Sequence, residues 1–166
     1  DLALPGAEIS LRVEHKELFR PAVGFADLES GVPLRGGELY YFYSATKPIT
    51  CAAVMQLLER KLLSLDDPIS RYLPEFSSPT VRMPDGSRVK SCRPITVEHL
   101  LTMTSGVDFG EAGSITESKW SEAFFASSMR FAPGSRFAYN SMNSYMLARI
   151  IERRSDEGFT EYARRR

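Results

Sequence analysis

The order of the secondary-structure signals constrains this chain most, because a few strands come first and helices dominate the rest of the sequence. Ile9, Leu11 and Val13 alternate with polar residues, which predicts a strand with one buried face. A polar turn is predicted at 15–17, and 22–26 is predicted to be the returning strand of a hairpin. So few strands form an incomplete sheet, because an apolar face needs further strands or covering elements.

The most apolar helix is predicted over residues 44–61, where apolar side chains cover more than one face and indicate burial on most sides. Ser44 is a favourable N-cap residue for this helix. Pro48 is tolerated there because it falls within about the first turn. The helix follows directly on an aromatic-rich extended run predicted at 39–43.

Shorter helices are predicted in the rest of the chain. Thr96 is expected to cap a brief helix that Gly106 ends. A loop at 107–118 and a helix at Trp120–Ala126 are expected next, and a strong helix is predicted from about Asn143 to Arg154. A further helix starts after Gly158, at Thr160. Residues 62–166 are thus predicted to form a mostly helical subdomain.

Charge and composition exclude several classes of protein. Lys plus Arg and Asp plus Glu number 21 each, so the chain lacks the basic footprint of a nucleic-acid-binding protein. No stretch approaches the roughly 18 apolar residues of a membrane span. His15 and His99 lie far apart without a local ligand cluster, so a zinc site is not expected. No other metal and no organic cofactor is implied.

The tetrad Ser44-Ala45-Thr46-Lys47 is the strongest candidate for chemistry. Residues three apart share a helix face, so the Lys47 amine can lie about one turn from the Ser44 hydroxyl. A serine hydroxyl becomes a good nucleophile only when a base accepts its proton, and lysine can serve if its pKa is lowered by burial or by neighbouring positive potential. A helix N-terminus supplies such potential and also backbone N–H groups for an oxyanion.

A second tetrad of the same type occurs at Ser87-Arg88-Val89-Lys90. Ordinary Ser and Lys frequencies of roughly 6–7% each predict about one such match by chance in a chain of this length. The second copy follows the turn Pro84-Asp85-Gly86 and has no buried helix that would hold the pair rigidly. We therefore interpret it as a chance match. From the local sequence alone, Ser44 is equally consistent with a nucleophile and with a helix N-cap.

Four separated segments together resemble the class C β-lactamase and penicillin-binding-protein-like serine hydrolases. The resemblance covers nearly the whole chain in the right order, and its segments are Phe42–Thr50, Met55–Pro74, Pro94–Gly106 and Pro133–Ser141. It implies an α+β fold of the β-lactamase/transpeptidase type, with an antiparallel sheet flanked by helices. It also implies that 1–166 is the N-terminal portion of one serine-hydrolase domain, with sheet strands in 1–43, the nucleophile helix in 44–61 and helices beyond.

The same resemblance assigns roles to four residues. It implies that Ser44 is the acylated nucleophile and Lys47 its partner in proton transfer. It also implies that Tyr139 is the other candidate base and the acid for the leaving group, and it leaves open which of the two takes the first proton. Ser141 stands where the family's Y-x-N motif has Asn, so it is the candidate substrate-binding residue. A packed structural role remains the alternative for Tyr139.

Two departures from the family bear on function. A hydroxyl at Ser141 is shorter than an amide and has fewer donors. No glycine of this chain has Lys or His two residues before it, so the family's late H/K-x-G motif has no counterpart. The strand that carries this motif also supplies an oxyanion N–H, and losing one such donor costs about 10²–10³ in rate. A missing C-terminal portion of the same protein is therefore the expected partner of this chain.

The sequence predicts a serine hydrolase or acyltransferase that acts on a small-molecule ester or amide through an acyl-enzyme on Ser44. β-Lactams, peptides and simple esters all fit this description. The alternative is a non-catalytic binding module that keeps the fold without turnover, which Ser141 and the missing motif favour. These 166 residues are expected to have little or no activity alone.

Overall fold

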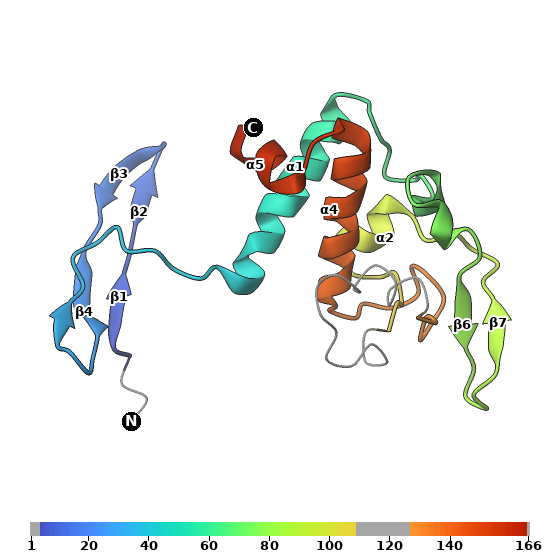
Figure 1. Cartoon of the computed structure of the whole chain (residues 1–166), viewed down its shortest axis with the longest axis horizontal. Helices are drawn as coiled ribbons and strands as arrows, with labels where there is room; N and C mark the ends of the chain where they lie inside the picture. The colour runs from blue at the N-terminus through green and yellow to red at the C-terminus, as the bar shows by residue number, and fades with distance from the viewer. Residues whose placement is uncertain (1–3, 109–126, 166) are drawn as a thin grey trace. The chain divides into compact units, whose positions relative to one another are not determined.

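The computed structural model describes residues 4–108 and 127–165, and the chain divides into two compact units, Asp1–Phe42 and Tyr43–Arg166 (Figure 1). The expected loop at 107–118 and helix at Trp120–Ala126 lie almost wholly outside the described residues. Each unit has its own secondary structure, β-strands in the first and mainly helices in the second.

The first unit consists of short antiparallel strands. A three-stranded sheet has the order β1-β4-β5, and β2 pairs with β3 in a separate ladder. The bounds are β1 Gly6–Glu8, β2 Leu11–Val13, β3 Lys16–Phe19, β4 Ala22–Asp27 and β5 Val32–Pro33. Strands were therefore correctly predicted in this unit, but the expected extended run at 39–43 is not one of them. Residues 39–42 form no regular secondary structure, and Tyr43 begins a 3-10 turn.

Two details of the predicted hairpin are wrong. Glu14 and His15 take positive φ angles of 47° and 65°, so the chain reverses there and β3 begins at once, at Lys16. Such paired left-handed residues suit the tight two-residue turn of a hairpin. The expected turn at 15–17 is therefore shifted, and the strand at 22–26 pairs with β1.

The expected buried face of the first strands is also wrong within the described structure. Leu11 and Val13 are each 52% exposed, and Ile9 is 56% exposed. Among its described residues, this unit contains only short two- and three-stranded ladders and no helix of its own to cover an apolar face. This is the incomplete sheet that the element order predicted.

The second unit carries the helices, and α4 lies beside α1 and α2 (Figure 1). The helices among its described residues are α1 Lys47–Glu59, α2 Val97–Leu101, α4 Ser141–Ser155 and α5 Phe159–Arg165. Short 3-10 turns and one antiparallel hairpin join them: η1 Tyr43–Thr46, η2 Ile69–Arg71, η3 Pro74–Phe76, β6 Thr80–Arg82 and β7 Arg88–Lys90.

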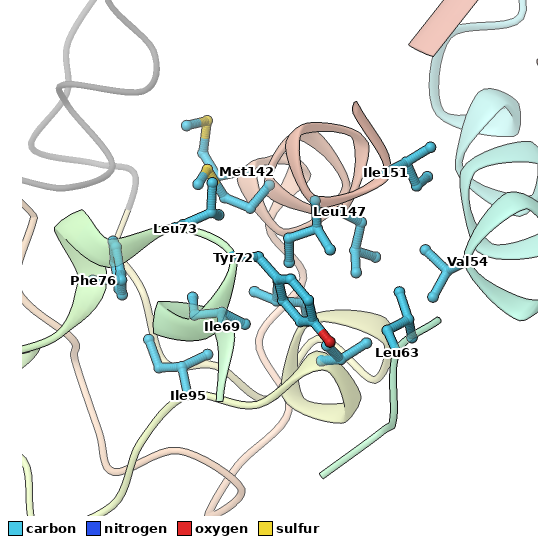
Figure 2. Packing of buried hydrophobic residues seen from close by; sticks show 14 of the residues in the cluster. Val54, Leu63, Ile69, Tyr72, Leu73, Phe76, Ile95, Met142, Leu147 and Ile151 are labelled. Atoms are coloured by element: carbon cyan, nitrogen blue, oxygen red, sulfur yellow. The ribbon is translucent and has the colours of Figure 1, made fainter. Parts of the chain in front are cut away.

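A hydrophobic core lies between these helices. Figure 2 shows Leu147 and Ile151 of α4 turned toward side chains from other elements, including Val54 of α1 and Tyr72. Leu147, Ile151 and Val54 are each at most 1% exposed. On α4 the buried residues Ile150 and Ile151 follow the buried Leu147 at the three- and four-residue spacing of a single helix face. Burial of this apolar face holds α4 against α1.

The helix predicted at 44–61 divides in two. Ser44 lies in η1, and α1 begins three residues later behind Thr46, so Ser44 is not the N-cap of the α-helix. The expected burial on most sides is wrong, because Ile49 and Met55 remain nearly half exposed. Only one face of α1 is buried, through Thr50, Ala53, Val54 and Leu57.

The caps of the other helices correct two more boundaries. Thr96 does cap α2, but the helix ends at Leu101 and Met103 takes the left-handed φ of 57°, so Gly106 does not end it. The last long helix begins at Ser141, two residues before the expected Asn143, because Asn140 caps it. The helix expected at Thr160 is confirmed as α5.

Across 4–108 and 127–165, none of the helices has both the length and the apolar character that a bilayer crossing requires.

Candidate active site

A sharp backbone turn presents Ser44. The preceding residue, Tyr43, has a φ of 45°, in the left-handed region that residues with a Cβ seldom adopt. Such a conformation persists only where the surrounding structure holds it, and these conformations concentrate at functional sites. The short turn η1 then leads into α1, so Ser44 stands at the exposed end of a helix whose other face is packed in the core.

Three predicted residues meet at the Ser44 hydroxyl. The Lys47 ammonium nitrogen Nζ donates to Ser44 Oγ over 3.0 Å, as the spacing of the tetrad predicted. Tyr139, 95 positions along the chain, donates its hydroxyl to the same oxygen over 2.8 Å. Lys47 Nζ also lies 4.9 Å from the centroid of the Tyr139 ring, within range of a cation–π contact. The structure therefore brings Ser44, Lys47 and Tyr139 together.

The electrostatics of this cluster act on Tyr139. The hydrogen bond with Lys47 is the largest cause that lowers the pKa of the Tyr139 hydroxyl, and the bond with Ser44 adds to it. A positive neighbour favours the tyrosinate, because it stabilises the charged form of the phenol. Ser44 and Tyr139 are exposed and Lys47 is half-buried, so the cluster faces outward and is open to a small molecule.

Ser141 lies two residues after Tyr139, at the first position of α4. It lines an open cavity of about 390 Å³ that adjoins the cluster. The other lining residues are Val107, Asp108, Arg130, Ala138, Tyr139 and Asn140. The structure thus places Ser141 beside a cavity that Tyr139 also lines.

Two asparagines to which the sequence analysis gave no role make hydrogen bonds near Tyr139, between the chain around 139–143 and residues 105–107. Asn140 accepts from the N–H of Met142 as the cap of α4 and donates to the carbonyl oxygen of Val107 over 2.8 Å. Asn143 is buried and accepts from the Ser105 hydroxyl over 2.6 Å. Asn140 had a usable signal, since Asn is a preferred N-cap directly before a periodic apolar run.

The remaining candidates have structural roles. The Nδ1 atom of His99 accepts from the N–H of Thr96 and completes a capping box on α2. The second tetrad has no comparable geometry, because Ser87 donates to Asp85 over 2.6 Å and Lys90 lies on the extended strand β7. Within 4–108 and 127–165 no three His, Cys, Asp or Glu residues gather in a way that would hold a metal ion.

Comparison with known proteins identifies relatives of this chain. The chain is 42% identical to the Esterase EstB of Burkholderia gladioli over 102 residues, which are 61% of this chain and 24% of that protein. The solved structure of EstCE1, described as a hydrolase with promiscuous acyltransferase activity, matches at a TM-score of 0.78 and 25% identity over 97% of this chain and 45% of that one.

A third match is the octameric penicillin-binding protein homologue from Pyrococcus abyssi, with a TM-score of 0.75 and 29% identity. It covers 97% of this chain and 37% of that one. The chain spans about a quarter to a third of the length of the curated relatives it matches. The fold is thus that of the β-lactamase/transpeptidase type, which the element order alone could not name.

The family model described as Beta-lactamase matches residues 1–166. Together with the meeting of Ser44, Lys47 and Tyr139, the match leads to one conclusion: this chain belongs to the Beta-lactamase family.

Proposed function

We propose that the protein containing this chain is a serine hydrolase or acyltransferase that works through an acyl-enzyme on Ser44. The observation that carries the proposal is the convergence of an amine and a phenol on one hydroxyl, Lys47 at 3.0 Å and Tyr139 at 2.8 Å. Both distances are within the reach that proton transfer requires. The names of an esterase and of a hydrolase with acyltransferase activity among the relatives support the same reaction class.

Tyr139 is the base that the electrostatics favour. In the resting arrangement Ser44 Oγ accepts from both neighbours, so neither bond removes its proton. Once Tyr139 is ionised, the Tyr139–Ser44 bond reverses and Ser44 donates to the phenolate. The lowered pKa of Tyr139 beside the Lys47 ammonium makes this ionisation easier, and Lys47 keeps its proton in this scheme.

The proposed reaction then follows in balanced steps. Ser44 Oγ attacks the carbonyl carbon of an ester or amide while its proton moves to Tyr139 Oη. The tetrahedral intermediate collapses, the bond to the leaving alcohol or amine breaks, and Tyr139 returns the proton to that group. Water or an acceptor alcohol then attacks the acyl carbonyl and gives its proton to Tyr139. The bond between the acyl group and Ser44 Oγ breaks, Tyr139 returns the proton to Oγ, and the acid or the transferred ester is released.

Ser141 and the cavity beside it are proposed to bind the substrate. The Ser141 hydroxyl can donate to or accept from a substrate amide or carbonyl, with a shorter reach than the Asn of the family motif. One oxyanion donor and the counterpart of the late H/K-x-G motif are assigned to a portion of the protein outside this chain, consistent with its covering a quarter to a third of its relatives. The substrate class is a small ester or amide, β-lactams included.

Turnover of a panel of activated esters and β-lactams by the full-length protein tests the proposal. We expect hydrolysis that falls at least about 10³-fold in Ser44→Ala and about 10²–10⁴-fold in Tyr139→Phe. Ser87→Ala is the matched control, because it removes the serine of the second tetrad, and it should keep full activity. Equal rates in the wild type and Ser44→Ala would refute the proposal.

A non-catalytic binding module is the second candidate, and Ser141 in place of the motif Asn is the observation that favours it. Such a module would bind the same esters or amides reversibly, with no adduct and no dependence on Lys47. Isothermal titration with Lys47→Ala distinguishes the two. Binding retained with acylation lost supports the enzyme, whereas binding without acylation in the wild type supports the module.

A further inference from the structure

We propose that Asn140 is a positioning residue that sets Tyr139 against Ser44 by bonding to the carbonyl oxygen of Val107. The inference rests on the proposed function, because it assigns the residue that holds the proposed base. The Tyr139 side chain is 58% exposed, and its ring has a cation–π partner in Lys47. Apart from the contacts with Ser44 and Lys47, little packs around the exposed ring, so hydrogen bonds to the residues on either side of Tyr139 add to its positioning.

Both neighbours of Tyr139 are tied to one segment. The N–H of Ala138 donates to the carbonyl oxygen of Met103 over 2.9 Å. The Asn140 amide donates to the carbonyl oxygen of Val107 over 2.8 Å. Tyr139 is thus held between two hydrogen bonds whose acceptors lie four residues apart on the segment 103–107.

The segment 103–107 is itself rigidly held. Ser105 and Val107 are buried, and the Ser105 hydroxyl accepts from the N–H of Val107 while it donates to Asn143 on α4. An isolated antiparallel bridge joins Val107 to Met129. A buried, hydrogen-bonded segment is a fixed reference, so a bond to Val107 transmits that rigidity to Asn140 and Tyr139.

Asn140 performs two tasks with two different atoms. Its Oδ1 accepts from the N–H of Met142 over 2.8 Å and caps α4, whereas its Nδ2 makes the bond to Val107. Capping alone is a structural role that Ser or Asp fulfils as well as Asn. The bond to Val107 needs a hydrogen-bond donor at the distance that an Asn amide reaches. A Ser hydroxyl is too short to reach Val107, and an ionised Asp has no donor.

Because different atoms of Asn140 cap α4 and bind Val107, substitutions can separate the two roles. Asn140→Ser and Asn140→Asp keep the cap and lose the bond to Val107, and Asn140→Ala loses both. Ser135→Ala is the matched control, because it removes another side-chain hydrogen bond to a carbonyl oxygen in the same stretch, that of Ala132, without touching 103–107. Circular dichroism and thermal melting first establish that each variant is folded.

In the full-length protein we expect Asn140→Ser and Asn140→Asp to lower kcat on an activated ester about tenfold to a hundredfold. KM can change as well, because Asn140 also lines the cavity proposed to bind the substrate. Ser135→Ala should match the wild type in both constants. The titration midpoint of Tyr139, measured as tyrosinate absorbance by difference from Tyr139→Phe, should move upward in Asn140→Ser. The reason is that its lowered pKa depends on closeness to Lys47 and Ser44. A merely structural cap would leave that midpoint unchanged.

Wild-type kcat together with a wild-type Tyr139 midpoint in folded Asn140→Ser would overturn the inference. Its failure is distinguishable from failure of the proposed function. If the wild type turns over no ester, the proposed function falls, but the Tyr139 titration still decides whether Asn140 positions the tyrosine. If Asn140→Ser does not fold, Asn140→Asp with the same two readouts decides the matter.

Discussion

The buried pair of Ser105 and Asn143 allows a quantitative test of how the Tyr139 segment is held. Both residues are 1% exposed, and the Ser105 hydroxyl donates to Asn143 Oδ1 over 2.6 Å. The bond joins the segment after α2 to the first turn of α4, across a separation of 38 positions in the sequence. Removing either partner leaves the other buried without its hydrogen bond.

The expected cost follows from that burial. Ser105→Ala strips Asn143 Oδ1 of its donor and the N–H of Val107 of its acceptor, so we expect a loss of about 1–3 kcal/mol in the free energy of unfolding. Asn143→Ala should cost about 2–4 kcal/mol, because it also leaves a cavity in the core. The double variant should cost less than the sum, with a coupling of about 0.5–3 kcal/mol.

Urea unfolding of the four proteins measures these free energies directly. Ser87→Ala is the matched control, since Ser87 donates to Asp85 over the same 2.6 Å but on the exposed surface, and it should change stability by less than about 0.5 kcal/mol. Strictly additive costs for Ser105→Ala and Asn143→Ala would refute the reasoning. An equal cost for Ser87→Ala would do the same, because burial would then not decide the effect.

Three further predictions concern other parts of the second unit. Burial lowers the pKa of His99 below 6.5, so the contribution of His99 to stability should be full above that pH and should fall as the pH drops through the lower folded pKa. Urea midpoints measured at several pH values should show this fall, and their dependence on pH should be weaker in His99→Gln. Leu147→Ala should cost about 2–5 kcal/mol in urea, because Leu147 fills the core beside α1, and a cost below about 1 kcal/mol would contradict that packing. Lys47→Met should raise the pKa of Tyr139, since Lys47 is the largest cause that lowers it, and an unmoved tyrosinate titration would count against the cluster.

Local patterns predicted the elements that depend on local interactions. The cap at Thr96 and the helix at Thr160 were predicted correctly, because a capping side chain and a helical period act within a few residues. The tetrad spacing likewise predicted that Lys47 reaches Ser44, since both lie on one short stretch of chain. The choice of the first tetrad over the second also agrees with the structure.

Long-range features could not be derived in the same way. Residue spacing does not show that Tyr139 meets Ser44 across 95 positions, and only the family resemblance suggested that pairing. The left-handed φ of Tyr43, in the turn that presents Ser44, could not be predicted from residue type, because tyrosine seldom adopts this conformation. The expected burial of Ile9, Leu11 and Val13 is wrong within the described residues, because apolar alternation predicts a face and not the element that covers it.

The central claim is that Ser44 is a nucleophile activated by Lys47 and Tyr139, and the site of covalent modification tests it most directly. The full-length protein is treated with a fluorophosphonate ester, digested, and its peptides are weighed by mass spectrometry. We predict one adduct, on the peptide that contains Ser44, with labelling slowed in Lys47→Ala and abolished in Ser44→Ala while the Ser87 peptide stays unmodified. An adduct on any other residue, undiminished labelling of Ser44→Ala, or no adduct at all would contradict the account.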